Sequence, residues 1–342
     1  MKHAARYRIC APPALRAGWI GILAAVCLAA CSGGNQLLPE ATGRDGEMIT
    51  VIDNRLWHDT TLRRMLHDVA ASGYPALPQH EPLFDVIEIK GSLLTHLLRT
   101  HRNMLILQVA DSMQSGVSLL HNKWATAQSV VLVRAHSAAA MTDLLLRQRE
   151  QIAGAAAQAD RRHAVAALKR HGNTALRDTL NRLFGGSPWF TGEYVLRKKT
   201  PHFAWIEFEP SDILMGIFIY RRPYSDSAAF LAPNMVAARN DVLRREVPGQ
   251  FDGTYMITSP LMTPQLQHVH HRHTRFVEMR GWWDMHDDYM GGPFVSHSFI
   301  APSRHEMITL EAFVYNPHGE KSRYLRRLEA VLHSFEMMER EK

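Results

Sequence analysis

Cysteine is scarce in this chain of 342 residues: Cys10, Cys27 and Cys31 are the only three, and all lie near its beginning. Three cysteines are too few for a disulfide scaffold. Long apolar runs are also missing, because no stretch reaches the roughly 18 to 20 residues that a membrane-spanning helix needs. With 46% hydrophobic and 21% charged residues, the chain is long and apolar enough for one large globular domain or two ordinary ones.

The sequence also lacks the short motifs of several enzyme classes. G-x-S-x-G, H-E-x-x-H, G-x-x-x-x-G-K-[ST] and G-x-G-x-x-G do not occur in it. It therefore gives no support to a hydrolase, a zinc protease, a nucleoside triphosphatase or a dinucleotide-binding enzyme. We expect a protein that is not an enzyme.

The first 30 residues are typical of a signal peptide. Positive charge without any acid is supplied by Lys2, Arg6, Arg8 and Arg16. Residues 17–30 are apolar and end in Leu-Ala-Ala, directly before Cys31. That arrangement resembles the bacterial lipobox, in which the cysteine thiol is acylated before cleavage. We predict a lipoprotein signal peptide over 1–30; the alternative is an ordinary cleaved signal with an incidental cysteine.

Acyl chains such as palmitate on Cys31 would hold the protein on a membrane without crossing it, since each buried CH₂ contributes about 0.8 kcal/mol. Residues 31–46 are predicted to be a flexible polar tether. By known sorting rules an aspartate in place of Ser32 would favour the inner membrane, so we expect the outer membrane. The first acid is Glu40, and this lack of acids next to the cysteine favours the periplasmic face.

The positive net charge of the whole chain comes largely from its first 30 residues. The formal charge is +6, but loss of the four cations of the signal peptide leaves 35 basic against 33 acidic residues. No Lys/Arg-rich tract or basic stripe with interleaved aromatics is present. We therefore expect no nucleic-acid partner.

The hydrophobic pattern predicts an α+β protein with two units after the tether. In the first unit, 47–186, strands at 48–52, 84–89, 104–109 and 130–133 alternate with helices beginning near Thr60 and over 93–100, as in a small α/β layer with some parallel pairing. Residues 137–184 are predicted to be a helical connector, interrupted at Gly172-Asn173.

The second unit, 187–338, is predicted to be an antiparallel sheet with packed helices near 227–245 and 321–335. Predicted strands cover 193–197, 203–208, 213–220, 255–258, 268–283, 294–300 and 307–315. In the last strand apolar side chains alternate with Thr309, Glu311 and their neighbours, which predicts one buried face. An apolar stripe on the final helix should cover that face. The arrangement resembles the PsbP/Mog1-type fold of other envelope lipoproteins.

Several short motifs resemble those of one bacterial family. They are Leu77-Pro78-Gln79-x-Glu81-Pro82-x-Phe84, Arg102-Asn103, Trp124-Ala125-x-x-Gln128, Met279-Arg280-Gly281-Trp282 and Met290-Gly291-Gly292-Pro293-Phe294-Val295-Ser296-His297-Ser298. The chain resembles a family of Bacteroidetes lipoproteins classed as a domain of unknown function, family number 4837, from about Met48 to Phe335. The resemblance implies a lipobox, two structural halves and an envelope location, and it implies no reaction, ligand or catalytic residue.

A histidine cluster is the first candidate for chemistry. If 268–283 is one strand, His268 and His270 project from one face and His271 and His273 from the other, so either pair offers two imidazoles to zinc or another divalent transition metal. No third ligand can be assigned. The alternative is an exposed strand whose histidines and arginines are solvated, since nearby cations repel a metal.

The second candidate is a binding surface on a predicted loop between two long strands. It consists of Trp282, Trp283, Asp284, Asp287, Asp288 and Tyr289. Adjacent tryptophans in a strand face opposite ways, so one is expected in the core and the other on a surface that binds a protein partner, an apolar ligand or a glycan. The alternative is a hairpin tip that its acids merely keep soluble. A Ser-His-Asp triad is excluded here, because Ser296 and His297 point to opposite faces.

These features favour a lipid-anchored envelope protein that acts as a binding or adaptor module and performs no chemistry. Its expected partners are the membrane, through the anchor, and an envelope protein or ligand. The alternative is a metal-binding protein or metal-dependent enzyme that uses the histidine cluster.

The lipid anchor can be tested by intact-mass measurement of the mature protein. We expect a mass that corresponds to a chain beginning at Cys31 plus acyl chains, and we expect globomycin to block processing of the precursor. In the Cys31→Ser variant the acyl mass should be absent. A bare N-terminus in the wild-type protein would contradict the prediction.

Overall fold

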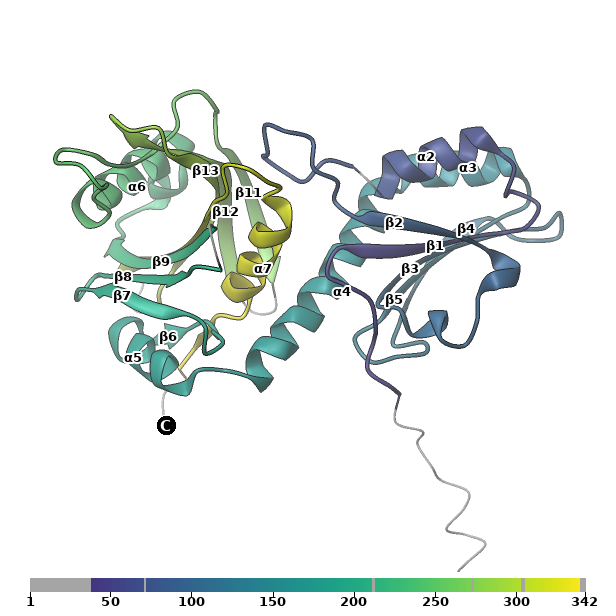
Figure 1. Ribbon diagram of the computed structural model, residues 1–342, viewed down its shortest axis with the longest axis horizontal. Coiled ribbons are helices and arrows are strands. Elements are labelled where there is room, and N and C mark those ends of the chain that lie inside the picture. The colour runs from purple at the N-terminus through teal and green to yellow at the C-terminus, as the bar shows by residue number, and fades with distance from the viewer. Residues whose placement is uncertain (1–37, 71, 211–212, 272–273, 303–304, 339–342) are drawn as a thin grey trace, which may run out of the picture. The chain divides into compact units, whose positions relative to one another are not determined.

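The N-terminal part is built on a five-stranded, mainly parallel sheet. A computed structural model describes residues 38–70, 72–210, 213–271, 274–302 and 305–338 of the chain (Figure 1). The strands, in the order in which they lie across this sheet, are β2 (Asp85–Lys90), β1 (Glu47–Ile52), β3 (Asn103–Val109), β5 (Ser129–Ala135) and β4 (Gly116–His121). The first four are parallel and β4 is antiparallel. The predicted parallel layer is confirmed, while β4 was not predicted.

Three helices cover one face of this sheet. They are α2 (Thr60–Ala70), α3 (Ala138–Arg147) and α4 (Arg149–Arg170), and they bury apolar side chains against the strands. In α2 the buried side chains are Leu62, Leu66 and Val69, which follow the helical period of the sequence.

The segment 91–100 covers the other face, and the helix predicted there is wrong. It forms two short 3₁₀ turns, Gly91–Leu93 and Leu98–Thr100. Leu94 and Leu98 pack on the sheet while Leu93 and Leu97 are exposed. The leucine spacing imitates a helix, but a segment this short gains too few backbone hydrogen bonds to offset helix nucleation.

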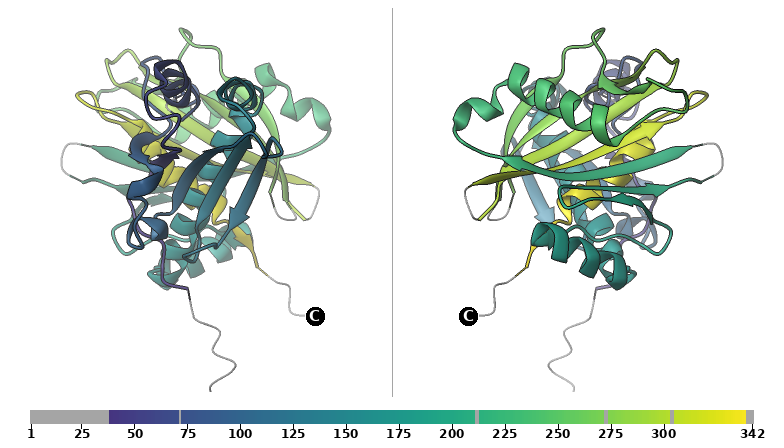
Figure 2. Two further views of the ribbon diagram at one scale, coloured as in Figure 1. Left: turned by 90° about the vertical axis from the view of Figure 1, so that its right-hand side faces the viewer. Right: turned by 90° about the vertical axis from the view of Figure 1, so that its left-hand side faces the viewer.

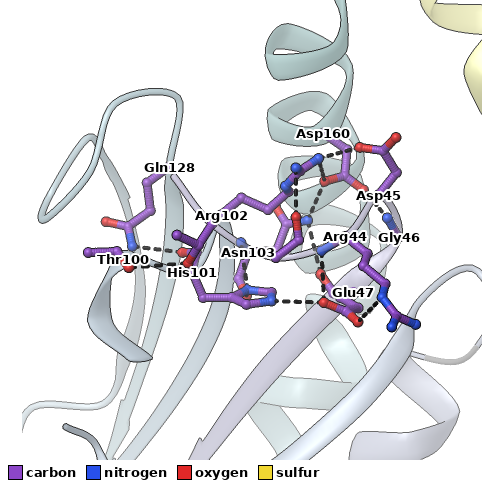
Figure 3. A network of polar contacts seen from close by, with 12 residues as sticks. Arg44, Asp45, Gly46, Glu47, Thr100, His101, Arg102, Asn103, Gln128 and Asp160 are labelled. Carbon is purple, nitrogen blue, oxygen red and sulfur yellow. Dashed lines mark hydrogen bonds and ion pairs between the residues drawn. The ribbon is translucent and has the colours of Figure 1, made fainter. Parts of the chain in front are cut away.

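A buried carboxylate joins α4 to the strands. Asp160 accepts hydrogen bonds from the backbone N–H of Gly46, at 2.8 Å, and from Nδ2 of Asn103, at 2.7 Å (Figure 3). Burial raises the pKa of Asp160, against the opposing effects of Arg326, the Gly46 bond and Arg102. This network sets the position of α4 relative to β1 and β3.

The Gly172-Asn173 break lies where it was predicted. The next helix, α5 (Thr174–Phe184), begins after Asn173, whose side chain accepts a hydrogen bond from the Leu176 N–H at 3.1 Å. It ends at Gly185, which adopts the left-handed conformation with φ of 70°.

The C-terminal part contains an antiparallel sheet of eight strands among the described residues. Across the sheet the order is β10 (Tyr255–Thr258), β12 (Thr274–His286), β13 (Gly291–Ile300), β14 (Glu306–Tyr315), β9 (Leu214–Pro223), β8 (Phe203–Phe208) and β7 (Val195–Lys199). The remaining strand, β11 (Gln265–His271), also pairs with β12. A small two-stranded sheet consists of β6 (Gly186–Ser187) and β15 (Glu336–Met337). The predicted single strand 268–283 is wrong, because β11 and β12 form a hairpin within it.

Both faces of this sheet are covered. Helix α7 (Ser322–His333) packs on one face and α6 (Ala232–Glu246) on the other; the right-hand view of Figure 2 shows α6 in green across the front of the sheet. The expectation of one buried face for β14 is therefore wrong, since its inner eight residues are all buried. Glu311 is tolerated on the α6 face because Arg239 donates to it at 2.8 Å and 3.0 Å.

Helix α7 also contacts the N-terminal part. The described chain from Glu40 onward forms one compact unit, which includes both parts. The carboxylate of Glu81 accepts the backbone N–H groups of Lys321, at 2.8 Å, and Ser322, at 2.6 Å. No side chain of α7 itself caps this end. Glu81, from a motif 240 positions earlier, therefore satisfies the first amides of the helix and places a negative charge at the positive end of its dipole.

Glu81→Gln should lower the free energy of unfolding by about 1–3 kcal/mol, because an amide NH₂ then faces a buried N–H donor. The measurement is urea unfolding followed by circular dichroism. Glu320→Gln serves as the control, since Glu320 is an exposed acid just before the same helix. Equal unfolding midpoints for the two variants would contradict the capping role.

Candidate functional site

The tip of the β12–β13 hairpin forms one side of a groove of about 430 Å³. The hairpin contributes Trp282, Asp284, Asp288 and Tyr289; the opposite side is formed by Leu77, Pro78, Gln79 and Glu81, together with Tyr315 and Lys321. We call this the hairpin groove. It brings together two of the sequence motifs that carried the family resemblance.

Four of the six residues predicted as a binding surface line this groove. The other two do not: Trp283 is 1% exposed in the core on the α6 face, and Asp287 is an exposed turn residue with φ of 57°. The prediction that adjacent tryptophans face opposite ways is confirmed, because Trp282 is half-buried at the groove. Trp283 donates its indole N–H to the Val314 carbonyl at 3.3 Å.

The groove has an acidic and aromatic character. Tyr289 is fully exposed. One oxygen of Asp288, Oδ1, accepts the backbone N–H of Tyr289 at 2.7 Å. The other, Oδ2, is buried and has no hydrogen-bond partner among the described residues. A buried carboxylate oxygen without a donor is costly.

The two glycines at the base of the tip are required by close packing. A Cβ on Gly292 would lie 2.0 Å from the Val314 carbonyl oxygen, and one on Gly291 would lie 2.8 Å from Oδ1 of Asp284. Only glycine lets β13 approach its neighbours this closely. This explains the Met-Gly-Gly-Pro run in physical terms.

A second candidate site is a buried polar cluster on the α7 face of the same sheet. Its buried members are Tyr74, Glu278, His297, Glu329 and His333, and the half-buried Arg280 lies among them. Glu278 and His297 are directly opposite each other on β12 and β13, with Nε2 of His297 3.2 Å from Oε2 of Glu278. The ring of His297 contacts that of His333 at 4.6 Å between centroids.

A chain of short bonds links the cluster to the N-terminal part. The Tyr74 hydroxyl donates to Glu329 at 2.6 Å, and Arg280 donates to Glu329 and to Glu278, each at 2.6 Å. These bonds hold the carboxylate of Glu278 in one orientation beside His297.

The surroundings determine the charge of each group in the cluster. Burial alone would raise the pKa of Glu278, but the bond to His297 and the charge of Arg280 hold that pKa well below its usual range. Burial lowers the pKa of His297, which leaves the imidazole neutral. Burial also opposes the charge of Arg280, yet Glu329 and Glu278 raise its pKa well above the usual value. Burial, with Glu329 adding to it, raises the pKa of Tyr74.

The cluster borders a large cavity of about 1330 Å³. Glu278, Arg280, Glu329 and His333 line it from β12 and α7, and the small residues Ala153, Gly154 and Ala157 line it from α4. Helix α4 also lines the cavity with charged side chains, among them Glu150, Asp160 and Arg161.

Sequence reasoning missed this cluster. It considered His297 as a partner of Ser296 and rejected that pairing. The two residues are adjacent on β13, and the Ser296 hydroxyl has no hydrogen-bond partner among the described residues. The partner of His297 is instead Glu278, 19 positions earlier. The alternation of Glu278 with Arg280 is visible in the sequence, but the register that sets Glu278 opposite His297 is not.

The predicted histidine cluster does not assemble on one continuous strand. His268 and His270 are exposed on β11 and share one face. His271 is the last residue of β11 and its side chain is not described, and His273 lies outside the described residues. Among the described residues, the grouping of metal-type ligands is Glu278, His297 and His333 instead.

No helix among the described residues is long and apolar enough to cross a membrane. Cys31 and the signal peptide 1–30 lie outside the described residues, so their roles stay predictions.

The fold and the site define an α+β protein of two parts, with a hairpin groove and a cavity bordered by buried charges. Residues 173–334 match the family model described as a domain of unknown function (DUF4837). Residues 41–169 match a second model, also described as a domain of unknown function (DUF8532). No curated protein matches the chain. The resemblance inferred from the motifs is therefore confirmed for the C-terminal part.

The two adjacent tryptophans of β12 should differ sharply in their contribution to stability. Trp283→Ala should lower the free energy of unfolding by about 3–5 kcal/mol, because it empties a core position. Trp282→Ala should cost less than about 1.5 kcal/mol, since Trp282 is only half-buried. Thermal and urea unfolding of both variants provide the test, and similar losses would contradict the assignment of one to the core and one to the groove.

Proposed function

We propose that this chain is a lipid-anchored protein of the cell envelope that binds a partner protein in its hairpin groove and performs no chemistry. The observation that carries the proposal is the groove itself, in which two carboxylates, Asp284 and Asp288, lie beside the aromatic side chains of Trp282 and Tyr289.

The chemistry of the groove favours a segment that carries lysine or arginine. Asp284 and Asp288 offer negative charge, and Trp282 and Tyr289 offer aromatic faces on which a cation can lie. Charge-assisted hydrogen bonds to carboxylates are stronger than neutral ones. A glycan is the alternative ligand, since sugars also stack on aromatic rings, but it would leave the negative charge unused.

The size of the groove suits a short segment of a partner. Its volume of about 430 Å³ lies within the range of about 300–1,000 Å³ that is usual for binding sites. Tyr289 projects fully into solvent, as expected of an aromatic anchor that becomes buried on binding.

The lipid anchor proposed at Cys31 would keep this groove close to a membrane. The predicted tether 31–46 is too long, because the compact unit begins at Glu40 and the backbone N–H groups of Ala41 and Thr42 donate to Thr126 and Thr100. Only the residues before Glu40 would then act as the tether between the acylated cysteine and the folded part. Partners within the reach of such a tether are themselves envelope components, and binding to them gains from the high local concentration that anchoring provides.

Crosslinking in living cells, read by mass spectrometry, tests the proposed groove. Trp282→Ala, Tyr289→Ala and Asp288→Asn in the full chain should each weaken binding of the main crosslinked partner about tenfold, because each removes a central contact. Trp57→Ala is the matched control, a half-buried tryptophan of the N-terminal part that lies outside the groove. If all three groove variants retrieve the same partners as the wild type in the same yield, the groove is not the binding surface.

A further inference from the structure

Three metal-type ligands converge at the edge of the cavity. Glu278, His297 and His333 each offer one ligand atom, and these atoms all lie within 4.8 Å of one another. All three side chains are buried, at 7%, 2% and 6% exposure. They come from β12, β13 and the last residue of α7, so the grouping depends on three separate elements.

The spacing fits a common ion after small movements. Two donors that bind one tetrahedral zinc ion at 2.0–2.1 Å are about 3.3 Å apart. Oε2 of Glu278 and Nε2 of His297 are 3.2 Å apart. His333 is the last residue of α7, and its ligand atom lies within 4.8 Å of the other two.

The carboxylate ligand is held in place by charged neighbours. Glu278 and Glu329 each form an ion pair with Arg280 at 2.6 Å. Arg280 and Glu329 orient Glu278 as an outer shell, in the way that hydrogen-bonded partners orient metal ligands elsewhere. The His268–His270 stretch has no such arrangement, since both side chains are exposed.

We propose that Glu278, His297 and His333 bind a divalent transition metal ion, with a fourth position open toward the cavity. Two imidazoles and one carboxylate are a donor set that zinc accepts, and three protein ligands with one open position are typical of zinc sites that bind a further ligand. Glu278 and His333 line the cavity, so a molecule in the cavity can supply the fourth donor. The site is independent of the hairpin groove and of the lipid anchor.

The decisive experiment measures zinc bound by the full chain, purified in detergent without a histidine tag, stripped with a chelator and reloaded. We expect one tightly held zinc ion per chain by elemental analysis, and a visible spectrum of tetrahedral cobalt when Co²⁺ replaces zinc. Removal of an outer-shell partner typically weakens metal binding about 10- to 100-fold. His297→Gln and His333→Gln each remove a ligand, so each should weaken zinc binding by more than this.

Two control variants separate this site from other histidines, of which the chain has 20. His101→Gln alters a buried histidine that lies 3.4 Å from a glutamate, Glu47, and it should bind zinc as the wild type does. The double variant His268→Gln/His270→Gln should also do so. Loss of tight zinc in the double variant alone would overturn the proposal.

The wild-type measurement decides the question even if a variant does not fold. A wild-type protein that retains no stoichiometric zinc and shows no tetrahedral cobalt spectrum would overturn the site by itself. Two results together would support the site. The wild-type protein retains zinc and shows the cobalt spectrum, and zinc addition raises the thermal midpoint of the His101→Gln variant but not that of a folded His333→Gln variant.

Discussion

The structure depends on the burial of α7 from two sides. Its apolar stripe packs on the C-terminal sheet, and its other side faces the N-terminal part. Water therefore has little access to the first backbone amides and the buried polar side chains of the helix, which need hydrogen-bond partners from the protein. The N-terminal part satisfies them instead: Glu81 accepts the first amides, and Tyr74 donates to Glu329. Because these bonds come from a distant part of the chain, the start of α7 and the cavity that it borders depend on contacts between both parts.

Two ion pairs lie on opposite faces of the same sheet, and their surroundings determine whether a ligand can reach them. On the α6 face, Arg239 and Glu311 pair under a tight core, with the guanidinium 3.9 Å from the centre of the Phe294 ring. That pair is closed off and packs as part of the core. On the α7 face, Glu278 and Arg280 pair beside a cavity, where the same kinds of side chain remain accessible to a ligand.

Two of the sequence runs that suggested the resemblance meet in the hairpin groove. Leu77-Pro78-Gln79 and Glu81 lie more than 200 positions before Met290-Gly291-Gly292, yet both runs meet there. Glu81 is needed for the end of α7, and Gly292 for the approach of β13 to Val314. These residues shape the groove, while Trp282, Asp288 and Tyr289 determine what it can bind.

The sequence by itself determined the α+β class, most strands and helices, and the break at Gly172-Asn173, because periodicity and turn residues are local properties. It also determined that Trp282 and Trp283 face opposite ways, since side chains alternate along a strand. Tertiary structure alone decided that residues 91–100 form turns, that β11 and β12 are separate strands, and that Glu278, His297 and His333 meet. Strand register and helix placement bring those three together, and both depend on packing between segments far apart in the chain.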